Sequence, residues 1–130
     1  DWAAFVAEHL RGERGQGRLL RRSTHRVLHT PVGDGGMALG WVVVERQWAG
    51  GRALHHTGSN TMNFANAWLA PERGFAILVC CNQGGDAAFR GTDAAVAALI
   101  PLARQRIHSG LASRAARVKH RPGVTDAIEP

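Results

Sequence analysis

The sequence predicts an α+β fold, in which an antiparallel β-sheet is flanked by an N-terminal and a C-terminal helix. Two observations predict this class. Apolar residues recur at helical spacing near the start of the chain and again after its middle. Between these segments lie four short runs rich in β-branched, aromatic and aliphatic residues, separated by short links. Such links join antiparallel strands, because a parallel crossover needs roughly a dozen residues or more.

The opening segment, residues 1–10, is predicted to be a helix. Asp1 can cap this helix, and Gly12 or Gly15 can end it. Its apolar stripe follows helical spacing and consists of Trp2, Phe5, Val6, His9 and Leu10. Residues 18–29 are expected to form either a short helix or a turn.

Four strand candidates follow, at residues 37–45, 52–57, 64–70 and 75–82. Pro71 and Gly74 favour a tight hairpin between the last two, because proline bends the chain and glycine takes a positive φ. The last candidate is apolar on both faces, which predicts a central place in the sheet. Three tryptophans suggest that the sheet needs a further covering partner, namely Trp41, Trp48 and Trp68.

A second helix is predicted from Asp86, which is a suitable N-cap, and Pro101 is expected to end or kink it. The apolar side of this helix comprises Phe89, Val96, Leu99 and Ile100. From about Ser109 the pattern fades, which predicts a loosely ordered tail. The expected organisation is one domain over residues 1–108 and a basic tail over residues 109–130.

The chain carries a net charge of +6, with its excess arginines gathered near both ends. No aromatic residues interleave with these clusters, so we expect solvated surface and no nucleic-acid site. No apolar run approaches the roughly 20 residues needed to span a bilayer. Cys80 and Cys81 are adjacent and point to opposite faces of a strand, so we expect two small apolar residues on a buried strand and no disulfide between them.

The most informative segment is residues 55–60, which read His-His-Thr-Gly-Ser-Asn and end a predicted strand. The hydroxyl of Thr57 can donate a hydrogen bond to a substrate carbonyl or carboxylate. Gly58 lacks a side chain, so a substrate can lie close to the backbone. Backbone N–H groups at such a strand end can stabilise a developing oxyanion.

A longer pattern surrounds this segment. It comprises Ala38-Leu39-Gly40-Trp41, Gly51, His56-Thr57-Gly58-Ser59-Asn60, Ala70-Pro71-Glu72-Arg73-Gly74-Phe75-Ala76-Ile77-Leu78-Val79 and Asn82. In order and spacing it resembles the penicillin-binding protein, serine β-lactamase and esterase family. In that family a Lys/His-Thr/Ser-Gly strand precedes a second strand, a Pro-Glu-x-Gly-type hairpin, a strand ending in Asn and a C-terminal helix. The resemblance implies a partial β-lactamase/DD-peptidase-like fold.

The resemblance also implies roles for four residues. His56 stands at the family's Lys/His position and would hold a substrate anion or tune the proton network. Thr57 would hydrogen-bond the substrate, and Gly58 would give it clearance. The backbone N–H of Ser59 would stand at the oxyanion-hole position. We expect neither a cofactor nor a metal ion.

The nucleophile of that family, the serine of Ser-x-x-Lys, is missing, and so is its Tyr-x-Asn or Ser-x-Asn motif. We therefore expect the C-terminal portion of a larger serine hydrolase, inactive alone, with no catalytic residue in this chain and with the missing N-terminal part as its partner. The implied substrates are β-lactams, D-peptides or small esters. Family members are commonly exported, which favours a periplasmic or secreted location.

Three alternatives compete with this interpretation. A self-contained triad of Ser59, a histidine and Asp86 is disfavoured, because His55 and His56 face opposite ways. For the same reason these two histidines cannot chelate one metal ion, and the other five are scattered along the sequence. A non-catalytic binding or interaction module with a basic tail is the main alternative function.

Overall fold

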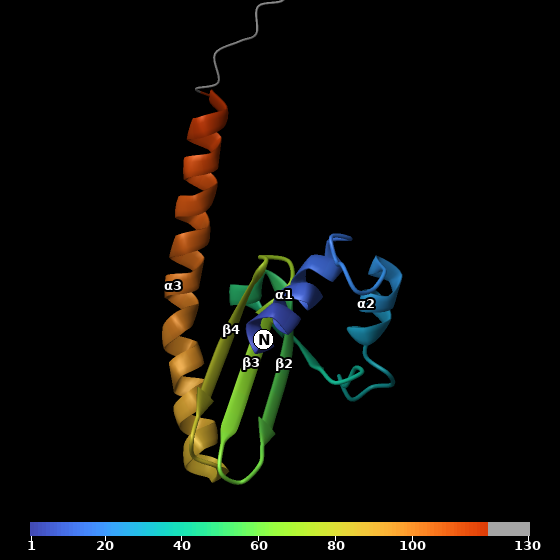
Figure 1. The fold of residues 1–130 in the computed structure, drawn as a ribbon, viewed down its shortest axis with the longest axis vertical. Helices are drawn as coiled ribbons and strands as arrows, with labels where there is room; N and C mark the ends of the chain where they lie inside the picture. Colours follow the sequence, from blue (N-terminus) through green and yellow to red (C-terminus); the bar gives the residue numbers. More distant parts are fainter. Residues whose placement is uncertain (120–130) are drawn as a thin grey trace, which may run out of the picture. The chain divides into compact units, whose positions relative to one another are not determined.

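The structure is a computed structural model that describes the backbone of residues 1–119 and the side chains of residues 1–110. The chain divides into two compact units between Ile100 and Pro101, and each is described by itself. Its elements are α1 (Trp2–Glu13), α2 (Arg22–Leu28), β1 (Val42–Arg46), the 3-10 helix η1 (Gln47–Ala49), β2 (Gly51–Ser59), β3 (Phe64–Ala70), β4 (Phe75–Cys81) and α3 (Gly85–Lys119) (Figure 1).

The four strands form one antiparallel sheet in the order β1-β2-β3-β4, as Figure 1 shows for β2 to β4. This topology confirms the predicted α+β class. The bounds of β3 are those that the sequence predicted, residues 64–70. β2 pairs with β3 from Leu54 opposite Leu69 to Ser59 opposite Phe64, so the two strands stay paired to the end of β2.

Alternation of side chains gives the sheet two apolar faces, and each face has its own core. The core on the face shared with α1 consists of Val6, Ala38, Trp41, Leu54, Ala67 and Leu69. The core on the face shared with α3 consists of Ala49, Ala53, Trp68, Ala70, Ile77 and Val96. Trp41 and Trp68 are only 6% and 8% exposed, so for these two the expected need of an outside partner is wrong. The chain itself covers both.

The N-terminal helix is longer than predicted, because α1 continues through Gly12 to Glu13. Its expected apolar stripe is only partly buried. Val6 is buried, whereas Trp2 and Phe5 are exposed. For residues 18–29 the sequence left a short helix or a turn open. The structure has a short helix there, α2. The carboxylate of Glu8 links α1 to the loop before α2 by accepting the backbone N–H groups of Arg18 and Leu19.

The first strand is shorter than the predicted run of residues 37–45. Gly40 has a φ of 87°, and the N–H of Ala38 donates to the carbonyl of Trp41 at 2.7 Å. The first residues of the predicted strand form this turn, and β1 therefore begins at Val42. Local turn geometry overrides strand propensity here.

The predicted central place of the last strand is wrong, because β4 lies at the edge of the sheet in the described chain. Apolar residues on both sides of a strand require both faces of the sheet to be covered, and α1 and α3 supply these covers. Such an apolar pattern does not require a neighbouring strand on each side of β4. The expected burial of the cysteines is also wrong for Cys80, which is exposed, and both cysteines are free.

Pro101 does not end the C-terminal helix, since α3 runs from Gly85 to Lys119 with this proline inside it. The proline removes one backbone hydrogen bond, but the surrounding residues are mostly good helix formers. Residues 109–119 of the expected loose tail are therefore helical, and residues 120–130 lie outside the described residues. Among the described residues, the helices lack an apolar stretch long enough to traverse a bilayer.

Candidate functional site

The candidate site lies at the C-terminal end of β2, where this strand extends beyond its pairing with β1. Pairing with β1 covers β2 only from Gly51 to His55. The next four residues, His56 to Ser59, are paired on the other side with β3. Their β1 side is an open strand edge in the described chain. Alternate backbone N–H and C=O groups of these residues point to this edge, as in any strand.

The two adjacent histidines point to opposite faces of the sheet, as the sequence predicted. His56 is exposed, and its Nδ1–H donates to the carbonyl of Gly40 at 2.7 Å. This bond leaves Nε2 of His56 as the acceptor nitrogen. His55 stacks on Trp68 with ring centroids 4.0 Å apart, and its Nε2–H donates to Oδ1 of Asn66. Burial lowers the pKa of His55, against the opposing effect of the Asn66 hydrogen bond.

An open groove of about 740 Å³ adjoins the end of β2 on the α3 face. It is lined by Thr57, Ser59, Thr61, Phe64, Gly84, Gly85, Asp86 and Phe89. The structure thus brings Thr57 and Ser59 together at one groove. The side chain of His56 is not part of this lining and instead approaches Trp41, with ring centroids 6.1 Å apart.

The fold does not require glycine at position 58. A Cβ atom built on Gly58 would meet nothing closer than Nε2 of His56, at 3.9 Å. The backbone of Gly58 is not in the left-handed region, so an alanine would fit both the space and the conformation. The clearance at this position is therefore unused by the chain and accessible to a ligand.

The hydroxyl of Ser59 is held within the turn that follows β2. It donates to the carbonyl of Asn63 at 2.9 Å and accepts the N–H of Thr61 at 3.1 Å. No hydrogen bond joins this hydroxyl to a histidine within the described residues. This geometry lacks the serine–histidine contact of a nucleophilic triad, which argues against Ser59 as a nucleophile.

The turn after β2 is held by internal hydrogen bonds and is strained at one residue. Oδ1 of Asn60 accepts the N–H groups of Met62 and Asn63. Thr61 has a φ of 71°, which is costly for a β-branched residue. The carbonyl of Thr61 lies where a Cβ of Gly84 would stand, at 2.1 Å, so glycine is required there. The groove wall is therefore fixed by close backbone packing.

Sequence reasoning missed a cluster of three histidine side chains. His9, His25 and His29 are scattered along the sequence, but one ring nitrogen from each lies within 4.8 Å of the others, and all three residues are buried. The sequence does indicate two members of this cluster. His25 and His29 are four residues apart, and this spacing places both rings on one face of a helix. The approach of His9 could not be read from spacing.

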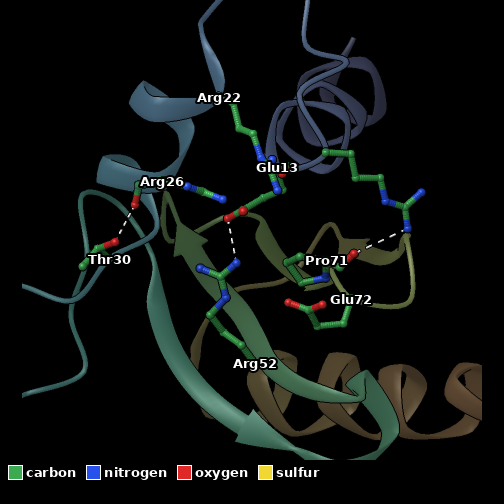
Figure 2. A pocket seen from close by; sticks show the side chains of 8 residues that line it. Glu13, Arg22, Arg26, Thr30, Arg52, Pro71 and Glu72 are labelled. Carbon is green, nitrogen blue, oxygen red and sulfur yellow. Dashed lines mark hydrogen bonds and ion pairs between the residues drawn. The ribbon is translucent and has the colours of Figure 1, made fainter.

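A polar cavity of about 460 Å³ lies beside this cluster and is lined by Glu13, Arg14, Arg22, Arg26, Thr30, Arg52, Pro71 and Glu72 (Figure 2). Three of its arginines are engaged by the protein itself. Arg52 pairs with the carboxylate of Glu13 at 2.8 Å, and Arg22 donates to the Glu13 carbonyl. Arg14 donates to the carbonyl of Pro71 at 3.5 Å. This cavity therefore joins α1, α2, β2 and the β3–β4 hairpin.

Comparisons with protein-family models, with curated proteins and with solved structures found no match to this chain. The function must therefore be argued from the chemistry of the residues described above.

Proposed function

We propose that this chain forms one wall of the acyl-transfer site of a β-lactamase-related serine hydrolase. The observation that carries the proposal is the open edge of β2 from His56 to Ser59 beside a groove of about 740 Å³. An extended substrate that carries an amide or ester carbonyl can align along such an edge and exchange backbone hydrogen bonds with it.

Each residue of this edge has a specific part in the proposal. The Thr57 hydroxyl donates to a carbonyl or carboxylate of the substrate, and Gly58 gives the substrate room against the backbone. The N–H of Ser59 donates to the oxyanion that forms when the carbonyl is attacked. His56 is oriented by the Gly40 carbonyl, so its acceptor nitrogen is held in one position for proton transfer.

The nucleophile must come from another segment or another chain, because Ser-x-x-Lys does not occur in this sequence. A strand edge with an oxyanion donor can stabilise charge, but it forms no covalent intermediate without an activated hydroxyl. This chain alone is therefore expected to hydrolyse neither β-lactams nor small esters. Fluorophosphonate labelling of any serine in it would contradict the proposal.

The first test is the mass and N-terminal sequence of the protein purified from its native host. We expect a longer product whose additional part contains Ser-x-x-Lys and Tyr-x-Asn. A native product that consists of this chain alone would overturn the hydrolase proposal and favour a non-catalytic binding module.

The second test compares two variants of that longer protein. Thr57→Val should lower kcat/KM for a chromogenic β-lactam or p-nitrophenyl ester about tenfold, which corresponds to one hydrogen bond of roughly 1.4 kcal/mol. Ser59→Ala is the matched control, because it keeps the backbone N–H and removes only a hydroxyl bound within the turn. Complete loss of activity in Ser59→Ala would instead identify Ser59 as the nucleophile.

A further inference from the structure

Three buried imidazole rings converge between α1 and α2, away from the edge of β2. His9 comes from α1, His25 from α2, and His29 from the residue that follows α2. Their exposed fractions are 7%, 1% and 0%. We propose that His9, His25 and His29 form a binding site for a divalent transition metal ion of the zinc type.

The spacing of the ring nitrogens suits such an ion after a small adjustment. Nδ1 of His9 lies 2.7 Å from Nε2 of His29, and one nitrogen from each of the three rings lies within 4.8 Å of the others. In a tetrahedral zinc site with Zn–N distances of about 2.0–2.1 Å, ligand nitrogens are about 3.3 Å apart. The His9–His29 pair therefore has to open by about 0.6 Å, and the nitrogen of His25 has to approach by up to about 1.5 Å, which a rotamer adjustment can supply.

His25 supplies an independent observation. Neither of its ring nitrogens has a hydrogen-bond partner among the described residues, although the side chain is almost fully buried. Oε1 of Glu8 lies 3.7 Å from Nε2 of His25, which exceeds hydrogen-bond length. A buried polar group without a partner destabilises the folded chain, and a metal ion that binds one of these nitrogens would relieve part of this cost.

The protonation of the other two rings fits metal binding. Nδ1–H of His29 donates to the carboxylate of Glu13, so Nε2 of His29 carries a lone pair that accepts Nδ1–H of His9. A metal ion that binds both of these nitrogens would replace this proton, and His9 would then carry its proton on Nε2. Neutral imidazole, with one nitrogen unprotonated, is the form that binds metals.

The surroundings of the cluster match those of known metal–histidine sites. Glu13 orients His29, and Arg52 in turn holds the Glu13 carboxylate, toward which its guanidinium points in Figure 2. A carboxylate behind a ligating imidazole is the usual device that fixes its tautomer and raises its basicity. Glu8 lies on the other side of the cluster next to His25, so two carboxylates offset part of the charge of a divalent ion.

The backbone around His25 is shaped to hold its ring in place. A Cβ atom on Gly12 would lie 2.0 Å from the ring of His25, and one on Gly17 would lie 2.8 Å from the carboxylate of Glu8. Only glycine at these positions allows α1 and the following loop to close onto the imidazole. The three nitrogens leave at least one coordination position for water or another ligand, as in three-histidine zinc sites.

The proposal is tested by titrating Co²⁺ into the full chain, without a histidine tag and after treatment with EDTA. We expect visible d–d absorption typical of tetrahedral Co²⁺ to saturate at one equivalent and to disappear when Zn²⁺ is added. Unfolding should shift to a higher temperature with one equivalent of Zn²⁺, because the ion binds the native state preferentially. Absence of saturable one-equivalent binding by the wild-type chain would overturn the proposal, whatever the variants do.

Variants then locate the ion. His25→Asn should weaken Zn²⁺ binding at least tenfold, and Glu13→Gln should weaken it about tenfold. His108→Gln is the matched control, since His108 is an exposed histidine of α3 outside the cluster. Equal effects of His25→Asn and His108→Gln would contradict the proposed site. Circular dichroism of each variant checks that it remains folded.

Discussion

Nδ1 of His9 lies 2.7 Å from Nε2 of His29, although the two residues are 20 positions apart in the chain. The contact joins α1 to the end of α2, and His25 packs against both rings with centroids 5.5 and 6.0 Å away. Trp41, at the turn before β1, meets His9 and His29 edge-on. A buried cluster of three histidine rings and one tryptophan ring therefore connects the helical segment to the sheet.

The steric requirement for Gly12 gives the first prediction. Gly12→Ala should destabilise the chain by about 1–3 kcal/mol, because its Cβ would overlap the ring of His25. It should also weaken Zn²⁺ binding. The measurement is urea unfolding, with Gly91→Ala as the control, since Gly91 is also a helical glycine but a Cβ on it meets nothing within 4 Å. Equal or better stability of Gly12→Ala would show that His25 can move aside easily.

A second prediction concerns the two glycines at the groove. Gly58→Ala should leave the free energy of unfolding nearly unchanged, because its Cβ has only one ordinary contact, at 3.9 Å. Gly84→Ala should be clearly destabilising, because its Cβ would overlap the carbonyl of Thr61. Thermal unfolding of both variants decides this. If the proposed longer hydrolase exists, Gly58→Ala should still reduce its kcat/KM, and unaltered activity would mean that substrates do not approach this strand.

The buried position of His55 gives a prediction about pH. The pKa of His55 is lowered in the native state from its ordinary value of 6.5, chiefly by burial. Below pH 6.5 the unfolded chain therefore binds more protons at this position, and the free energy of unfolding falls as the pH decreases toward the native pKa.

This prediction is checked with His55→Gln, which should lose less stability than the wild type between about pH 7.5 and about pH 5. Urea unfolding in EDTA measures the difference, and His108→Gln serves as the exposed control. An identical pH dependence in wild type and His55→Gln would mean that His55 titrates alike in the folded and unfolded chain.

Trp41 offers an optical readout of the histidine cluster. Its ring centroid is 5.2 Å from that of His9, and the side chain is buried. One equivalent of Co²⁺ should therefore quench part of the tryptophan fluorescence, and Trp41→Phe should remove most of that quenching. Trp68→Phe is the control, because Trp68 belongs to the core on the opposite face of the sheet. Quenching that depends on Trp68 instead would place the ion elsewhere.

Some features of this protein were determined by local sequence alone. The bounds of β3 follow from its alternating run and from the turn residues Pro71 and Gly74 that end it. The opposite orientation of His55 and His56 follows from the two-residue period of any strand. These features depend on neighbours within a few positions, so the sequence is sufficient to predict them.

Other features depended on how distant segments pack, and only the tertiary structure decided them. The edge place of β4 reflects sheet order, which its apolar pattern does not encode. The histidine cluster exists because Gly12 allows α1 to close onto His25, while Glu8 accepts backbone N–H groups of the loop between the helices. Spacing along the chain cannot reveal such a meeting, because it results from side chains and backbone of two helices fitting together in space.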